Sequence, residues 1–113
     1  MVSVIIPVFN REKTIKESIT SVLNQTYNDF EIIIVDDFST DKTTEVIENI
    51  TDARIHLIKL TSNHGACYAR NIGIIASCGD IIAFHDSDDL WDKNKLKKCI
   101  DFMEKNNIDI MFN

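Results

Sequence analysis

The chain has 113 residues, of which 44% are hydrophobic and 27% charged, and its formal net charge is −6. This is the composition of one soluble globular domain, and its acidity argues against a nucleic-acid surface, which needs a basic patch. No apolar run approaches the roughly 18 residues that cross a bilayer, and no signal-peptide pattern follows Met1. We therefore expect a cytoplasmic protein, with membrane association at the inner face only through sequence beyond this chain.

The three cysteines are odd in number and lack the spacing of a metal site. They are Cys67, Cys78 and Cys99. We expect them to be small, reduced core residues.

The chain opens with a strand followed by a helix. Residues 2–9 form a near-continuous apolar run, which is typical of a strand buried on both faces of a parallel sheet. Pro7 cannot donate to a strand ladder, so it should lie where pairing stops. Asn10 has the chemistry of an N-cap, and the apolar face of the helix after it would be Ile15, Ile19, Val22 and Leu23.

The same alternation continues to the end of the chain. The predicted elements are a strand at 30–35, a helix capped by Ser39 or Thr40, an edge strand at 54–60, a helix at 69–76 closed by Gly79, a strand at 81–84, a helix from Trp91 or Asp92, and a strand at 108–112. This pattern predicts a single α/β domain over 1–113, with a Rossmann-like, mostly parallel sheet and helices on both faces. Because the chain ends inside a predicted strand, we expect it to be cut from a longer protein.

Polar residues gather where the predicted strands end, at the edge where open α/β sheets bind ligands. They are Asn10 and Arg11 after the first strand, Asp36 and Asp37 after the second, and Asp86, Ser87 and Asp88 after the fourth. No comparable cluster marks the amino ends of the strands. The pattern therefore predicts one acidic cleft built from three loops.

The sequence from Asp86 to Asp89 places three carboxylates within four positions. Neighbouring carboxylates disfavour each other's charge, and Mg²⁺ or Mn²⁺ would relieve this through oxygen ligands. A loop that only caps the next helix explains an isolated motif equally well. No glycine-rich phosphate motif is present, so a phosphate would be held by a metal and a basic side chain, for which Arg70 is a candidate.

Four motifs together resemble family 2 glycosyltransferases, which have the GT-A fold and use nucleotide-diphosphate sugars. They are Val4-Ile5-Ile6-Pro7-Val8-Phe9-Asn10, Ile33-Ile34-Val35-Asp36-Asp37-Phe38-Ser39-Thr40-Asp41, Ala69-Arg70-Asn71 and Phe84-His85-Asp86-Ser87-Asp88-Asp89. They occur in the family's order at strand ends, and the resemblance covers essentially the whole chain.

The resemblance implies roles for particular residues. Pro7 and Phe9 would flank the nucleobase, Asn10 and Arg11 would line the same pocket, Asp37 would accept the N–H of a uracil-like base, and Asp36 would support the loop. In the D-x-D motif, Asp86 would lie near the ribose or the metal, and Asp88 would bind Mn²⁺ or Mg²⁺ directly. Asp89 would support the motif, and Arg70 would face the diphosphate.

The resemblance also implies sugar transfer with inversion, from a UDP-sugar to a saccharide or lipid-linked saccharide in bacterial polysaccharide assembly. The general base would lie beyond Asn113, so we expect these residues alone to be inactive. A non-catalytic nucleotide-sugar-binding module would make the same contacts. Asp36 and Asp37 could instead only cap a helix, Phe9 could be ordinary core, and we expect His85 to be structural.

Two unrelated classes of protein share parts of this pattern. A phosphorelay receiver domain also binds Mg²⁺, but its acidic pair should follow the first strand, where this chain has Asn10. An aspartate-nucleophile phosphatase carries D-x-D-x-T, but Leu90 stands where the threonine should be. We regard both classes as the weaker alternatives.

Overall fold

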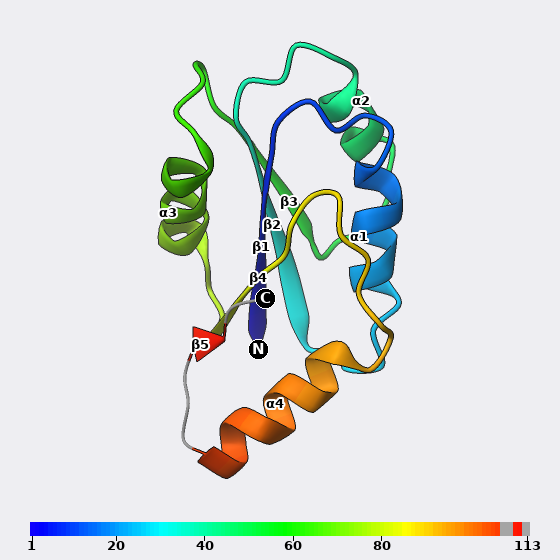
Figure 1. Cartoon of the computed structure of the whole chain (residues 1–113), viewed down its shortest axis with the longest axis vertical. Coiled ribbons are helices and arrows are strands. Elements are labelled where there is room, and N and C mark those ends of the chain that lie inside the picture. The colour runs from blue at the N-terminus through cyan, green and yellow to red at the C-terminus, as the bar shows by residue number, and fades with distance from the viewer. Residues whose placement is uncertain (107–109, 112–113) are drawn as a thin grey trace.

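The computed structural model describes residues 1–106 and 110–111, in which strands and helices alternate (Figure 1). The strands are β1 (Val2–Val8), β2 (Phe30–Asp36), β3 (Ile55–Lys59), β4 (Ile81–Phe84) and β5 (Ile110–Met111). The helices are α1 (Ile15–Leu23), α2 (Thr43–Glu48), α3 (Ala66–Ala76) and α4 (Lys95–Asn106). The predicted alternation is confirmed. No helix of the described residues has the length and apolar character needed to span a membrane.

The strands form one sheet in the order β3-β2-β1-β4-β5, and every pairing is parallel. The chain moves outward from β1 through β2 to β3, then returns to the other side of β1 with β4. Strand order therefore reverses at β1, and ligands bind at such a point in open α/β sheets. The receiver-domain alternative is wrong, because that class has the order 2-1-3-4-5.

Helices cover both faces of the sheet, as predicted. α1 and α2 lie on one face and α3 on the other (Figure 1). Val4 and Ile6 of β1 belong to the same buried cluster as Ile15 of α1, and α4 contributes to this cluster too. On the opposite face, a Cβ atom on Gly73 of α3 would lie 2.5 Å from Cγ2 of Ile5, so α3 packs closely against β1.

Pro7 lies where pairing on one side of β1 has ended. The carbonyl of Ile5 accepts from His85 N–H on the β4 side, and the carbonyl of Val8 accepts from Asp37 N–H on the β2 side. The backbone N–H and C=O groups of successive strand residues point to opposite neighbouring strands, so those of Pro7 point toward β4, as those of Ile5 do. Pro7 lies beyond the last β1–β4 pair, which is Ile5 with Phe84. The absent N–H of Pro7 therefore costs no ladder hydrogen bond.

The predicted helix caps are wrong. Asn10 does not cap α1, whose N-cap residue is Thr14, because its side chain instead binds the loop after β2. Neither Ser39 nor Thr40 caps α2; Asp41 accepts the N–H of Thr43 through Oδ1 at 2.9 Å. The Asn10 side chain is thus engaged by a loop 30 residues away in the sequence, whereas the contact at the start of α2 is local and comes from Asp41, which also accepts the N–H of Glu12.

Three other boundaries differ from the predictions. α4 begins at Lys95, after Trp91, because the intervening residues bond to α1 and the turn after it. Gly79 lies beyond the end of α3, and an added Cβ would approach the Ser3 Oγ to 2.6 Å, so close packing explains this glycine. β5 lies within the predicted strand at 108–112, of which residues 108, 109 and 112 lie outside the described residues.

The cysteines are free thiols, but their expected burial is wrong. Cys67 and Cys78 are exposed, and Cys99 is half-buried. The buried residues of α3 are Ala69 and Gly73, one turn apart, so Cys67 lies on another face of that helix. Apolar neighbours in the sequence of a helix do not share its buried face.

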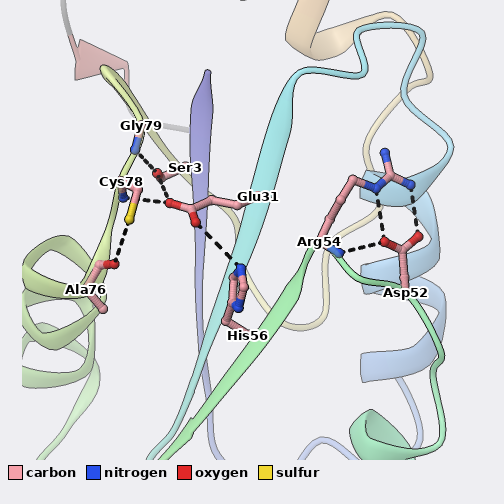
Figure 2. A network of polar contacts seen from close by, with 8 residues as sticks. All are labelled: Ser3, Glu31, Asp52, Arg54, His56, Ala76, Cys78 and Gly79. Atoms are coloured by element: carbon pink, nitrogen blue, oxygen red, sulfur yellow. Dashed lines mark hydrogen bonds and ion pairs between the residues drawn. The ribbon is translucent and has the colours of Figure 1, made fainter.

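A polar network lies at the amino ends of the central strands, where none was expected (Figure 2). Glu31 of β2, only 8% exposed, accepts from Ser3 Oγ at 2.6 Å and from the N–H of Cys78 at 2.7 Å. Ser3 Oγ in turn accepts from the N–H of Gly79. His56 Nε2 lies 3.7 Å from the other oxygen of Glu31. The network ties β1 and β2 to the loop before β4, at the end of the sheet opposite the acidic loops.

Candidate functional site

A cavity of about 360 Å³ lies at the carboxyl ends of β1, β2 and β4. It is lined by Pro7, Val8, Phe9, Arg11, Asp37, Ala66, Ala69, Arg70, Asp86, Ser87 and Asp88. Most of the residues predicted for the cleft therefore lie around one space. Asn10, Asp36 and Asp89 do not line it.

The segment after β1 contributes an aromatic ring to the cavity. Phe9 follows Val8 directly and is 41% exposed, so its interpretation as ordinary core is wrong. Arg11 is held at its backbone, where its N–H donates to Thr43 Oγ1 at 2.9 Å. This leaves an apolar surface and a cation at the same edge of the cavity.

Asn10 fixes the shape of this segment from outside the cavity. Its backbone has a φ of 51°, in the left-handed region that asparagine tolerates. Its Oδ1 accepts from the N–H of Thr40 at 2.8 Å, and its own N–H donates to Ser39 Oγ at 3.0 Å. Asn10 therefore braces the loops after β1 and β2 against each other.

The two aspartates after β2 are buried and play different parts. Asp36, 3% exposed, accepts from the backbone N–H of Ser39 at 3.0 Å and so supports its own loop. Asp37, 4% exposed, accepts from the N–H groups of His64 and Gly65, each at 2.8 Å. Neither caps α2. Each oxygen of a carboxylate accepts two hydrogen bonds, so Asp37 retains acceptor capacity toward the cavity that it lines.

Helix α3 presents one side of its first turns to the cavity. Ala66, Ala69 and Arg70 are spaced at i, i+3 and i+4, which places them on one face. The two alanines leave room, and the guanidinium of Arg70 lies 3.9 Å from the Asp86 carboxylate. A basic group from α3 thus meets the acidic loop after β4.

The loop after β4 places two carboxylates at the cavity. Asp86 and Asp88 are exposed and line it, and a turn in which Asp89 N–H donates to the Asp86 carbonyl joins them. Asp89 accepts from Leu90 N–H and lies outside the lining. The described residues contain no cluster of three or more potential metal ligands. Two carboxylates nevertheless suit Mg²⁺ or Mn²⁺, since such ions keep waters and take further oxygens from substrate phosphates.

His85 lies beneath this loop as a buried side chain, as expected for a structural residue. It is 1% exposed, and its Nε2 lies 2.6 Å from Ser18 Oγ of α1. Burial lowers the pKa of His85 to about 4, against the opposing effect of Asp89 and Asp86. Trp91 packs edge-on against its ring and is buried in the core.

Sequence reasoning missed several members of the site. Val8, Ala66 and Ala69 line the cavity, and the Ser18 hydroxyl donates to the Asp86 carbonyl of the loop after β4. The i, i+3, i+4 spacing of Ala66, Ala69 and Arg70 could have predicted that one face of α3 lines the cavity. Ser18 gave no such signal, because a serine within an amphipathic helix does not indicate which distant residue its hydroxyl contacts.

Comparison with known proteins agrees with this geometry. Residues 3–112 match the family model described as glycosyl transferase family 2. The chain is 45% identical over 112 residues to the UDP-Glc:alpha-D-GlcNAc-diphosphoundecaprenol beta-1,3-glucosyltransferase WfgD of Escherichia coli, covering 99% of this chain and 44% of that protein. It is 44% identical over 105 residues to the putative teichuronic acid biosynthesis glycosyltransferase TuaG of Bacillus subtilis, covering 91% and 42%. The chain thus spans less than half the length of either relative.

Solved structures share the fold. S. aureus TarS 1–349 in complex with UDP-GlcNAc superposes with a TM-score of 0.88 at 33% identity, covering 94% of this chain and 32% of that one. The mannosyltransferase PcManGT from Pyrobaculum calidifontis, in complex with GDP-Man and Mn²⁺, has a TM-score of 0.84 at 28% identity, covering 90% and 32%. The architecture of this chain is therefore the GT-A fold.

Proposed function

Since the chain belongs to glycosyltransferase family 2, we propose that it binds a UDP-sugar in the 360 Å³ cavity and forms the donor half of a metal-dependent, inverting glycosyltransferase. The observation that carries the proposal is the meeting of Phe9, Asp37, Arg70 and Asp88 around one cavity. An aromatic surface, a buried acceptor, a cation and an exposed carboxylate are the groups that a nucleoside diphosphate with a metal requires.

The nucleobase of the donor would lie at the end of the cavity that is formed by β1 and β2. Phe9 and Pro7 offer apolar surface to the faces of the ring. Asp37 accepts the ring N–H of uracil, and its two backbone hydrogen bonds hold the carboxylate in place before the nucleotide arrives. UDP and UDP-GlcNAc are bound by the structural relative TarS.

The diphosphate lies between Arg70 and the acidic loop. Asp88 would hold Mn²⁺ or Mg²⁺ directly, with Asp86 near the metal or the ribose and Asp89 supporting the turn. When bound, the ion neutralises charge that develops on the leaving diphosphate. Arg70 adds a fixed positive charge beside the same oxygens. The relative PcManGT is described with Mn²⁺.

Transfer also needs a general base and an acceptor site, and the carboxylates that line this cavity, Asp37, Asp86 and Asp88, are already assigned to the nucleobase and the metal. We propose that both come from sequence beyond Asn113 and that residues 1–113 are the donor-binding part of a longer catalytic domain. A saccharide or lipid-linked saccharide is the proposed acceptor, in line with the diphosphoundecaprenol named for the E. coli relative. A cytoplasmic location, at the inner face of the membrane, goes with that acceptor.

Calorimetric titration of UDP, with and without Mn²⁺, tests the proposal on this chain. We expect wild-type protein to bind UDP more tightly with Mn²⁺, and Asp88→Asn to lose that dependence. Asp89→Asn is the matched control, because this neighbouring carboxylate lies outside the cavity, so most of the dependence should remain. If the UDP affinity of the wild type is the same with and without Mn²⁺, the proposed metal site is refuted. Robust sugar transfer by residues 1–113 would contradict the missing base and also exclude a non-catalytic module.

A further inference from the structure

A row of polar residues on α1 and its two ends supports the acidic loop and the segment after it. Thr14, Ser18, Ser21 and Gln25 are spaced at i, i+4, i+7 and i+11, which places them on one side of the helix. Thr14 Oγ1 donates to the Ser87 carbonyl at 3.4 Å, and Ser21 Oγ accepts from Trp91 N–H at 3.1 Å. The Gln25 side chain donates to the Asp92 carbonyl at 2.7 Å. The row therefore follows the backbone away from the acidic loop.

Ser18 is the member of the row that bonds to the backbone of Asp86, one of the proposed metal ligands. Its side chain is fully buried, and its hydroxyl donates to the Asp86 carbonyl at 3.1 Å. A serine hydroxyl has one hydrogen, so at its 2.6 Å contact with His85 Nε2 it must accept. With the Ser18 hydroxyl donating to Asp86, the contact to His85 is made by a proton on Nε2, so that two successive hydrogen bonds run from His85 through Ser18 to Asp86.

These two hydrogen bonds end at the backbone of a loop whose two cavity-lining carboxylates are exposed. The Asp86 side chain is 63% exposed, and Asp88 is exposed too, so little packing fixes either carboxylate. The backbone of the loop is instead held from below, by His85 N–H on the Ile5 carbonyl and by Ser18 on the Asp86 carbonyl. A metal site is only as well placed as the backbone that carries its ligands.

We propose that Ser18 and His85 are positioning residues for the acidic loop: the His85–Ser18–Asp86 hydrogen bonds set the spacing of Asp86 and Asp88 and hence the affinity for the metal. The proposal rests on the donor site proposed above. It goes beyond that site because neither Ser18 nor His85 lines the cavity.

The test compares variants that break the hydrogen-bond chain with variants that keep it. Ser18→Ala removes its centre. His85→Asn shortens the side chain so that its amide cannot reach Ser18, whereas His85→Gln places an amide N–H near the position of Nε2. Thr20→Ala is the matched control on the same helix, since Thr20 Oγ1 is exposed and bonds only to Lys16 of its own turn.

The first readout is Mn²⁺ affinity in the presence of UDP, measured from the electron paramagnetic resonance signal of free Mn²⁺, beside UDP affinity without metal. We expect Ser18→Ala and His85→Asn to weaken Mn²⁺ binding about tenfold and to leave metal-free UDP binding unchanged. His85→Gln and Thr20→Ala should resemble the wild type. A general loss of folding would lower both affinities together, and unchanged Mn²⁺ affinity in the two breaking variants would overturn the proposal.

The second readout needs no ligand, so it separates this proposal from the proposed function. Within residues 86–89, exchange of the Asp89 amide, whose N–H donates to the Asp86 carbonyl, should accelerate in Ser18→Ala and His85→Asn, while the amides of β1 and β2 keep their protection. If the wild type binds no Mn²⁺ with UDP, the proposed function fails, and exchange still decides whether Ser18 holds the loop. Unchanged exchange at 86–89 would overturn the positioning role.

Discussion

The guanidinium of Arg70 and the carboxylate of Asp86 lie 3.9 Å apart, one from α3 and the other from the loop after β4. Their side chains are 37% and 63% exposed, so the pair stabilises the fold little and both groups remain accessible. The contact joins two segments of the site that the sequence separates. It lies where we propose that the diphosphate binds, with Arg70 as its positive partner.

Replacing Arg70 should affect the diphosphate more than the base. We expect Arg70→Gln to weaken UDP binding about tenfold or more, because a charge-assisted hydrogen bond contributes roughly 1.5–3 kcal/mol, and to leave uridine binding unchanged. Calorimetry with both ligands measures this. Lys97→Gln removes one positive charge from an exposed position on α4 and controls for net charge. Equal losses for UDP and uridine would place Arg70 away from the phosphates.

Replacing Asp37 should lower both the stability of the fold and the affinity for UDP. In Asp37→Asn, one oxygen becomes an amide group that faces the N–H of His64 or Gly65, leaving a buried donor without an acceptor. We expect the free energy of unfolding in urea to fall by about 1–3 kcal/mol, with weaker UDP binding in the protein that remains folded. Asp101→Asn, at an exposed position of α4, should change neither quantity. Wild-type stability in Asp37→Asn would contradict the described hydrogen bonds.

Burial of His85 predicts a loss of stability in acid. Its pKa of about 4 in the folded protein lies below the ordinary value of 6.5. Between these values the unfolded chain binds a proton that the folded one does not, so unfolding becomes easier as the pH falls. We expect the His85 contribution to decrease by about 3 kcal/mol from pH 6.5 to 4. The difference between urea unfolding curves of wild type and His85→Gln, in EDTA, isolates it; parallel pH profiles would refute the shift.

The Glu31 network should matter for stability and not for the nucleotide. Glu31→Ala leaves the Cys78 N–H and the Ser3 hydroxyl without their acceptor, and we expect a loss of about 1–3 kcal/mol in unfolding free energy. Glu31→Gln keeps one oxygen for both donors and should cost less. UDP affinity should stay unchanged in both, because the network lies at the amino ends of the strands. Equal damage by Gln and Ala would mean that the charge of Glu31, rather than its role as acceptor, is what stabilises the network.

Local pattern was enough to predict the sheet and the end of it that carries the site. Residues 2–8 are apolar at every position but Ser3, which fits a central strand buried on both faces, and the alternation in β3 fits an edge. Because parallel strands bring their carboxyl ends together, Asp37 and Asp88 could be assigned to one cleft without knowledge of any contact.

Contacts between distant segments could not be predicted in this way. Asn10 is a good N-cap by composition, but the loop after β2 offers its side chain better partners. Gly79 resembles a helix terminator, although the close approach of Ser3 is the reason that it must be glycine. Ser18 is one polar residue of a helix, and its partner His85 lies 67 residues later in the sequence. In each case the deciding partner is a tertiary neighbour that no short window of sequence contains.

The central position of β1 has a consequence for how the chain is made. β1 pairs with β2 after one short helix, but its partner on the other side, β4, is synthesised only after three further elements. A nascent chain that has reached β3 therefore carries β1 with one open, apolar edge, which is a template for pairing with other chains. Docking of β4 closes that edge and brings the acidic loop to the cavity in the same event. A chain that can bind the donor with its metal is thus one in which β4 already covers the apolar edge of β1.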